Sequence, residues 1–346
     1  MNSLVATLEP ADTAGVLTAA LSQVHGPAAR LQAWSVHRIS NRGKHRTVRY
    51  ELDVCVDGAA EICHHQWVGK FYEQNEDARR TAAILQELAA GDCGARGGMV
   101  IPRVMAYYAP LRLLLLAYEV GQSVTSALGP HNPPVLAAIG RALAALHATP
   151  AGLDGPVISA ADVLAELQPR LADLYACFPG EVNSLRQAQA QLERQMPREA
   201  APPSLLHGDF GPAQLLWQSG HLVVLDFDQT RQGDPACDLG NLLAQFRRIT
   251  LRKPAKLGDF AALRQGILAA YQRHAPPDPD LSERVAWHER ATLLRKIHFL
   301  VSNTTRHSEA DSLQSRRAEA LLLLGDVAAW NKLNAPTGTR PCVAQA

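Results

Sequence analysis

The sequence has 346 residues, 47% of them hydrophobic, and its 34 Lys and Arg against 33 Asp and Glu give a formal net charge of +1. This length and composition predict a globular chain, built as one two-lobed unit or two domains, and exclude a disordered protein. The balanced charge excludes the basic excess typical of nucleic-acid binders, and the longest apolar runs are too short to span a bilayer, so we expect neither a nucleic-acid nor a membrane partner.

The first part of the chain is predicted to be rich in strands. Residues 33–56 and 65–72 alternate in polarity around turn residues at 40–46 and at Asp57-Gly58, which is typical of an antiparallel meander. In chain order, the predicted elements are a helix at 12–32, strands at 33–40, 47–56 and 65–72, a helix at 75–90, a Gly-rich loop at 91–98, and strands at 103–108 and 111–120.

After Gly121 the apolar residues recur mainly at helical spacing. The predicted elements here are helices at 133–148, 159–178, 181–195, 234–248, 258–274, 281–304 and 309–331, with one strand-rich insert at 205–228. We therefore predict an α+β chain with a small antiparallel-sheet lobe at 1–120, a larger helical lobe at 121–333, and a disordered tail at 334–346.

The strand-rich insert contains a dense set of polar residues. Strands at 215–217 and 222–225 flank a turn, and the resulting hairpin places Gln214 and Asp226 at neighbouring ends, beside Asp209. Three oxygen-bearing side chains then converge on one point. A hard cation such as Mg²⁺ prefers ligands of this kind.

The same residues match the needs of phosphoryl transfer. This reaction requires a carboxylate that orients and deprotonates the attacking hydroxyl, metal ligands, and a cation for the phosphates that are not transferred. Asp209 suits the first role, Gln214 and Asp226 the second, and Lys70, within a predicted strand, the third. Their order matches the protein-kinase series of a strand lysine, H-R-D-x-x-x-x-N and D-F-G.

Three segments of the chain resemble the aminoglycoside phosphotransferase family. They are LLHGDFGPAQLL at 205–216, VLDFD at 224–228 and GDPACDLGNLLAQF at 233–246, with weaker similarity over about residues 60–300. The resemblance implies a bilobal protein-kinase-like fold and an ATP-dependent, magnesium-requiring enzyme that phosphorylates a hydroxyl of a small molecule. We expect it to be a monomer or homodimer.

The resemblance also implies roles for individual residues. Asp209 would accept the proton of the acceptor hydroxyl, and Lys70 would hold the α- and β-phosphates. The backbone of the lobe hinge would bind adenine, at Tyr118, Glu119 and Val120. Magnesium would be held by Gln214 and Asp226, while Asp228 would either reach a second magnesium or help to form the turn.

The GDPACDL segment predicts support for the site. Asp234 is a favourable N-cap and Pro235 fits the first helical position, so a helix is expected to start there. Asp238, one turn into that helix, resembles the family's aspartate that bonds back to the catalytic loop.

Two departures from the family pattern bear on activity. Gln214 stands where the family usually has Asn, and its extra methylene moves the amide oxygen by about 1.5 Å, one C–C bond. At the position of the helical glutamate that would pair with Lys70, this chain has Thr81. The acids that could substitute for it are Glu76, Asp77 and Glu87.

Two other classes of function stay open, a nucleotide-binding pseudokinase or scaffold and a metal-dependent phosphoesterase. The acceptor is also open, because an aminoglycoside, a sugar or an amino alcohol would each fit. An aminoglycoside would need an acidic cleft. The candidate acids for such a cleft are Glu283, Glu289, Glu309 and Asp311.

The six cysteines are scattered, and no two form a C-x-x-C pair. Their spacing predicts neither a zinc site nor a disulfide framework. Free thiols suit a reducing compartment, and the acidic N-terminal segment lacks the basic region of a signal peptide. We therefore expect a cytoplasmic protein.

Overall fold

The computed structural model describes residues 10–40, 45–56, 62–129, 132–150, 157–198, 203–302 and 310–333. Some expectations fall elsewhere in the chain. Most of the turn at 40–46, the Asp57-Gly58 turn and the tail at 334–346 lie outside the described residues. None of the described helices is long and apolar enough to cross a membrane.

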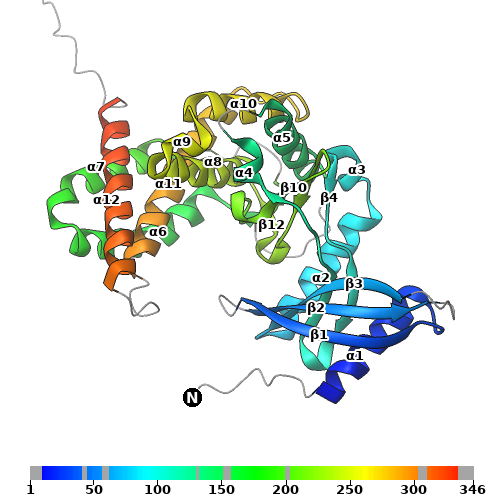
Figure 1. The fold of residues 1–346 in the computed structure, drawn as a ribbon. Coiled ribbons are helices and arrows are strands. Elements are labelled where there is room, and N and C mark those ends of the chain that lie inside the picture. The colour runs from blue at the N-terminus through cyan, green and yellow to red at the C-terminus, as the bar shows by residue number, and fades with distance from the viewer. Residues whose placement is uncertain are drawn as a thin grey trace, which may run out of the picture.

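A five-stranded antiparallel sheet forms the first part of the chain, in the order β1-β2-β3-β6-β5. Its strands are β1 Arg30–Ser40, β2 His45–Cys55, β3 Ile62–Tyr72, β5 Val104–Tyr108 and β6 Leu113–Ala117. Two helices pack against it, α1 Pro10–His25 and α2 Asn75–Ala90. Figure 1 shows this sheet, with β1, β2 and β3 in blue, at one end of the molecule and α7 and α12 at the other.

The leucine run in β6 is explained by burial on both faces of the sheet. Leu113 and Leu115 pack in the cluster that contains α1, whereas Leu114 and Leu116 pack in the cluster that contains α2. Successive residues of a strand point to opposite faces, so a strand covered on both sides needs apolar residues at every position. This central strand lies directly beside β3 and Lys70.

Helices dominate the second part of the chain, as predicted. They are α4 Val124–Leu128, α5 Pro133–His147, α6 Ala160–Cys177, α7 Val182–Arg194, α8 Ala236–Arg252, α9 Pro254–Leu257, α10 Phe260–Gln272, α11 Leu281–Ser302 and α12 Ala310–Leu333. One apolar core joins α5, α8 and α10 to the strands of this part, and a second joins α6, α7, α11 and α12. The mixed α+β class of the prediction is confirmed.

Two smaller sheets surround the predicted hairpin. One has the order β4-β11-β10-β7, with β4 Met99–Val100, β7 Gln122–Ser123, β10 Leu215–Gln218 and β11 His221–Val224. The other has the order β8-β12-β9, with β8 Val157–Ile158, β9 Ser204–Leu206 and β12 Arg231–Gly233. The prediction of a single strand-rich insert after Gly121 was therefore wrong, because strands of two or three residues carry no readable alternation. The lobe boundaries near residue 120 stay a prediction.

Other elements of the first part of the chain also differ from the prediction. Helix α1 ends at His25 rather than at 32, because Gly26 adopts φ +87° and Pro27 follows it. The predicted loop at 91–98 contains a short helix, α3 Cys93–Gly97. Strand β6 begins at Leu113, after a 3₁₀ turn at Ala109–Leu111.

Candidate active site

The loop that carries Asp209 leaves strand β9 through a glycine that cannot be replaced without strain. Gly208 has φ +82°, and a Cβ there would lie 2.0 Å from the carbonyl oxygen of Gln229. Only glycine tolerates both this left-handed conformation and this close approach. The sequence His207-Gly208-Asp209 thereby turns the chain sharply and aims Asp209 into a cavity.

A buried aspartate in α8 ties this loop down, which confirms the expectation for Asp238. Its carboxylate accepts the backbone N–H of His207 at 2.7 Å and that of Gly208 at 3.0 Å, and lies 3.3 Å from Nε2 of His147. Burial alone would raise the pKa of Asp238, but the hydrogen bond and charge of His147 outweigh it and lower the pKa. Helix α8 begins one residue later than expected, at Ala236, whose N–H bonds to Asp234 at 2.9 Å.

The hairpin forms in the predicted register. Leu215 pairs with Val224, and the carbonyl oxygen of Gln214 accepts the N–H of Leu225 at 2.8 Å, so Gln214 and Asp226 lie at neighbouring strand ends. The ring of His207 bonds to the carbonyl oxygen of Leu225 at 2.8 Å, which joins the loop to the hairpin. The predicted convergence of Asp209, Gln214 and Asp226 is therefore observed.

Two amides hold the Asp209 carboxylate. Nε2 of Gln214 donates to Oδ2 at 3.4 Å, and Nδ2 of Asn241 donates to Oδ1 at 3.5 Å. Burial raises the pKa of Asp209, and the charge of Asp226 raises it further, whereas Lys296 and His207 lower it. Asn241 was missed at the level of sequence. Its spacing, one helical turn after Asp238 on the same face of α8, is the signal that could have found it.

Asp226 and Asp228 lie opposite Lys70 from β3. The Lys70 ammonium donates to Oδ1 of Asp226 at 2.6 Å and to Oδ2 of Asp228 at 3.0 Å. Asp226 adopts φ +67°, a left-handed conformation that is costly for a residue other than glycine. Such strain is characteristic of functional positions.

Among the described residues, Lys70 pairs with Asp226 and Asp228 rather than with any of the three acids considered in α2. The acid nearest the start of α2, Glu76, pairs instead with Arg79, and Asp77 lines the cavity. Burial alone would lower the pKa of Lys70, but the carboxylates of Asp228 and Asp226 outweigh it and raise the pKa. Thus Lys70 stays charged, with partners from the second part of the chain.

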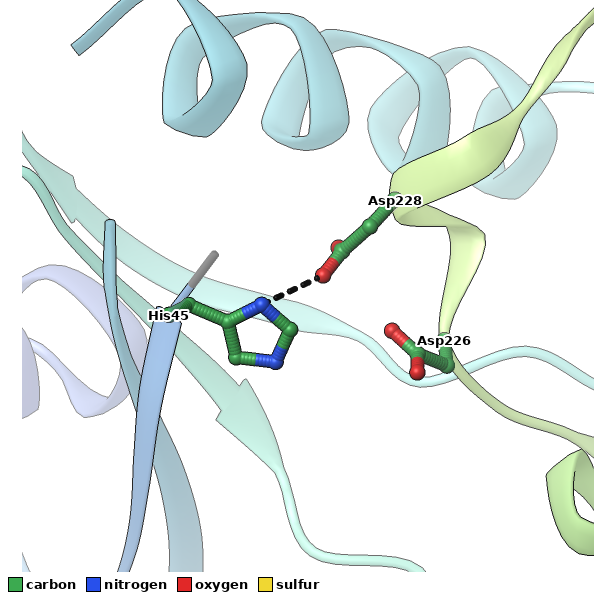
Figure 2. A group of neighbouring side chains, drawn as sticks. All are labelled: His45, Asp226 and Asp228. Carbon is green, nitrogen blue, oxygen red and sulfur yellow. Dashed lines mark ion pairs between the residues drawn. The ribbon is translucent and has the colours of Figure 1, made fainter. Parts of the chain in front are cut away.

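Two further residues join this group, and neither was predicted. Tyr72 donates its hydroxyl to Oδ1 of Asp228 at 2.8 Å. Nδ1 of His45 lies 3.1 Å from Oδ2 of Asp228, and Figure 2 shows its imidazole pointing toward the two carboxylates. Burial and the charge of Lys70 lower the pKa of His45. Only the strand register, in which His45 is opposite Tyr72, brings them together.

These residues surround one cavity of about 870 Å³, within the size range of ligand pockets. Of the predicted hinge residues, Tyr118 and Glu119 line it, whereas Val120 is 54% exposed and does not. The N–H of Tyr118 already donates to the carbonyl oxygen of Gln66 at 3.0 Å, so it cannot also bind a ligand. Burial raises the pKa of Glu119.

The donor set fits a magnesium ion. Oε1 of Gln214 is buried and has no hydrogen-bond partner among the described residues, although such atoms are normally satisfied. Ligand atoms of His45, Asp226 and Asp228 lie within 4.8 Å of one another. An amide oxygen and two carboxylates are the ligands that this hard cation prefers.

The acids considered for the acceptor cleft do not gather at this site. Glu289 is buried and pairs with Arg264 at 3.3 Å. Glu283 lines a separate cavity of about 700 Å³, together with Trp287 and Arg290. Glu309 lies outside the described residues, and Asp311 belongs to α12.

One comparison with known proteins identifies a family. The family described as "Phosphotransferase enzyme family" matches residues 56–288, more than half of the chain. No curated protein sequence gives a significant match.

Solved structures of phosphotransferases share the fold. A thermostable mutant of aminoglycoside phosphotransferase APH(4)-Ia, in a ternary complex with AMP-PNP and hygromycin B, has a TM-score of 0.59 and 15% identity, covering 93% of this chain and 99% of that one. Macrolide 2′-phosphotransferase MphH from Brachybacterium faecium has a TM-score of 0.53 and 18% identity, covering 88% and 97%. An ethanolamine kinase from Plasmodium vivax has a TM-score of 0.54 and 10% identity, covering 92% and 89%. At these identities the likeness shows a kinase-like fold.

Proposed function

Because the chain belongs to the phosphotransferase enzyme family, we propose that it transfers the γ-phosphate of ATP to a hydroxyl of a small molecule, with Asp209 as the base. The observation that carries this proposal is the meeting of Lys70, Asp209, Gln214 and Asp226 around one cavity. These are the positions that the reaction needs, and they come from both parts of the chain. The nucleotide complex of the APH(4)-Ia structure supports ATP as the donor.

Each group has a role that its surroundings support. Asp209 is held by two amides and would orient the acceptor hydroxyl and take its proton. Burial raises its pKa, which makes the carboxylate a stronger base. Lys70 is buried and charged, and it would bind the phosphates that remain on the nucleotide.

Magnesium would be held by Asp226 and Gln214, with Asp228 beside them. When bound, the ion would neutralise charge on the phosphate oxygens. The unsatisfied oxygen of Gln214 supports this assignment, because a metal ligand is the partner that it lacks. Adenine would lie near Glu119, which lines the cavity from the segment between β6 and β7.

The substitution Asp209→Asn tests the proposal. We expect kcat to fall by about 10²- to 10⁴-fold, the usual contribution of a general base, with ATP binding retained. The folded-state pKa of Asp209 is raised, so its ionised form opposes folding as the pH rises through that pKa. A neutral amide should therefore leave the melting temperature at pH 7 unchanged or higher.

The measurement is ADP release in the presence of hydroxyl acceptors, including aminoglycosides, sugars and amino alcohols. Asp92→Asn, which alters an exposed acid in a surface pair, is the control and should keep wild-type turnover. Near-wild-type phosphorylation by Asp209→Asn would show that Asp209 is not the base. Magnesium-dependent ATP binding without phosphorylation of any acceptor would instead favour a nucleotide-binding scaffold.

A further inference from the structure

A group of cations lies near Asp209 but outside the lining of the cavity. Lys296 and Arg295 are neighbours in α11, and Arg231 lies in β12. None of the three lines the cavity that contains Lys70 and Asp226. We call Arg231, Arg295 and Lys296 the cation cluster.

The fold brings the cation cluster to the catalytic loop by two routes. Arg231 is paired with Leu206, two residues before Gly208 and at the start of the loop that carries Asp209. Helix α11 packs on α8, the helix that holds this loop, where Sγ of Cys237 lies 3.5 Å from Nε2 of His288. The charges of Lys296 and Asp209 act on each other, as do those of Arg295 and Arg231.

The chain supplies no carboxylate that pairs directly with the cation cluster. Among the described residues, none of the three cations has an acidic oxygen within 4.0 Å, and Nε of Arg231 is buried without a hydrogen-bond partner. Elsewhere in this part of the chain, Arg264 pairs with Glu289, and the buried Arg284 pairs with Asp234 and Asp278. Burial lowers the pKa of both Arg295 and Lys296 and outweighs the opposing charges of Glu166 at Arg295 and of Asp209 at Lys296.

Such an arrangement is costly unless an anion joins it. A charge taken out of water destabilises a fold when it has no partner, and three like charges add repulsion. Arginine is suited to carboxylates and phosphates because its planar fork can form two parallel hydrogen bonds. A polycation at the same place would meet repulsion instead.

We propose that the acceptor of this enzyme is an anionic hydroxyl compound, whose carboxylate or phosphate group binds the cation cluster while its hydroxyl lies at Asp209. This inference rests on the proposed function, and it selects among the acceptors that the family's fold would allow. As the acceptor, it favours a hydroxy acid or a phosphate ester over an aminoglycoside or an amino alcohol. Arg231 and Lys296 are the specificity-determining residues.

Anion binding can be tested without any turnover. Thermal unfolding of the full-length protein is followed with magnesium and AMP-PNP present, while D-gluconate or glycerol 3-phosphate is titrated as the carboxylate or phosphate probe. We expect one of the probes to raise the melting temperature. Arg231→Gln and Lys296→Gln should weaken that probe's apparent affinity by about 10- to 100-fold, the usual worth of a hydrogen bond to a charged group.

Matched variants separate this role from a structural one. Lys296→Arg keeps the charge and should keep binding, and Lys256→Gln removes an exposed lysine outside the cluster and should change nothing. Without probe, Lys296→Gln should melt at the wild-type temperature or above it, because a repulsion is removed. A clear fall in its melting temperature, or equal probe binding by all variants, would overturn the proposal.

Turnover then separates this inference from the function on which it rests. With gluconate, glycerol 3-phosphate, glucose, ethanolamine and kanamycin as acceptors, we expect the highest kcat/KM for an anionic compound. Lys296→Gln should raise its KM and leave the KM for ATP unchanged. A preference for ethanolamine or kanamycin would overturn the anionic acceptor and keep the kinase, whereas anion binding with no ADP release would overturn the kinase alone.

Discussion

The two sides of Asp209 differ in how their charges are neutralised. On the nucleotide side, Lys70 has two carboxylate partners, and Asp228 also has Tyr72 and His45. On the acceptor side, Arg231, Arg295 and Lys296 have no carboxylate within 4.0 Å among the described residues. The nucleotide side is therefore neutralised by the chain itself, and the acceptor side depends on its ligand. Stability measurements should distinguish the two sides as sharply as kinetics do.

The largest effect is expected at Asp238, which holds the loop between the two sides. Asp238→Ala removes the acceptor of two backbone N–H groups and leaves His147 without its carboxylate. Breaking a buried charged network of this kind costs about 3 to 5 kcal/mol of unfolding free energy. Urea denaturation measures it, and Asp238→Asn, which keeps one acceptor oxygen, should lose less. A loss below about 1 kcal/mol would contradict the role of Asp238 as a tether.

The next largest effect is expected at Lys70, on the nucleotide side. Lys70 forms ion pairs with Asp226 and Asp228, so it should compete with magnesium for these carboxylates when no nucleotide is bound. Lys70→Met should bind Mg²⁺ about tenfold more tightly, the worth of a charged hydrogen bond, while losing ATP turnover. Isothermal titration with Mg²⁺ alone makes the measurement. Weaker Mg²⁺ binding by Lys70→Met would show that these acids do not form the metal site.

A smaller effect is expected for Gln214→Asn. The shorter side chain withdraws the amide oxygen by about 1.5 Å, one C–C bond, and also weakens the long bond from Nε2 to Asp209. We expect the Mg²⁺ concentration for half-maximal turnover to change by about tenfold, the lower end of the effect of altering a metal's surroundings, because asparagine keeps the amide oxygen. Turnover that is wholly independent of residue 214, tested also with Gln214→Ala, would remove it from the metal site.

The smallest effect is expected in the pH dependence of turnover, where Lys296 on the acceptor side changes the pKa of Asp209. Activity requires the ionised carboxylate, and burial raises its pKa, so turnover should fall with decreasing pH at a higher pH than for an exposed aspartate. The positive charge of Lys296 lowers that pKa. Lys296→Gln should therefore move the acid limb of the kcat profile to higher pH, with little change at its plateau. A shift to lower pH would contradict their proximity.

Local sequence patterns predicted one half of this site better than the other. The loop at Asp209 and the hairpin that aligns Gln214 with Asp226 depend on residues close together in the chain. Their geometry follows from turns and strand pairing, which can be read from spacing. The tether from Asp238 to His207 spans 31 residues and was expected only from the family resemblance.

The residues that were missed depend on contacts between distant segments. His45 meets Asp228 only through the register of β2 and β3, and Arg231 approaches Arg295 only because a three-residue strand and a long helix pack beside the same loop. Neither relation leaves a pattern in a single sequence. The partners of Lys70 could not be identified from the sequence for the same reason, because they are more than 150 residues away.

The four-stranded sheet has a mechanical consequence. Its two edge strands, β4 and β7, precede and follow the β5–β6 hairpin. Of its central strands, β11 ends two residues before Asp226, and β10 begins directly after Gln214. The five-stranded sheet is thus connected to the four-stranded sheet by two segments, one before β5 and one after β6. Two such connections would permit a hinge rotation of one sheet relative to the other and would oppose a shear motion between them. Because Lys70 lies in the five-stranded sheet and Asp226 follows the four-stranded one, this rotation would change the distance between them along a single path.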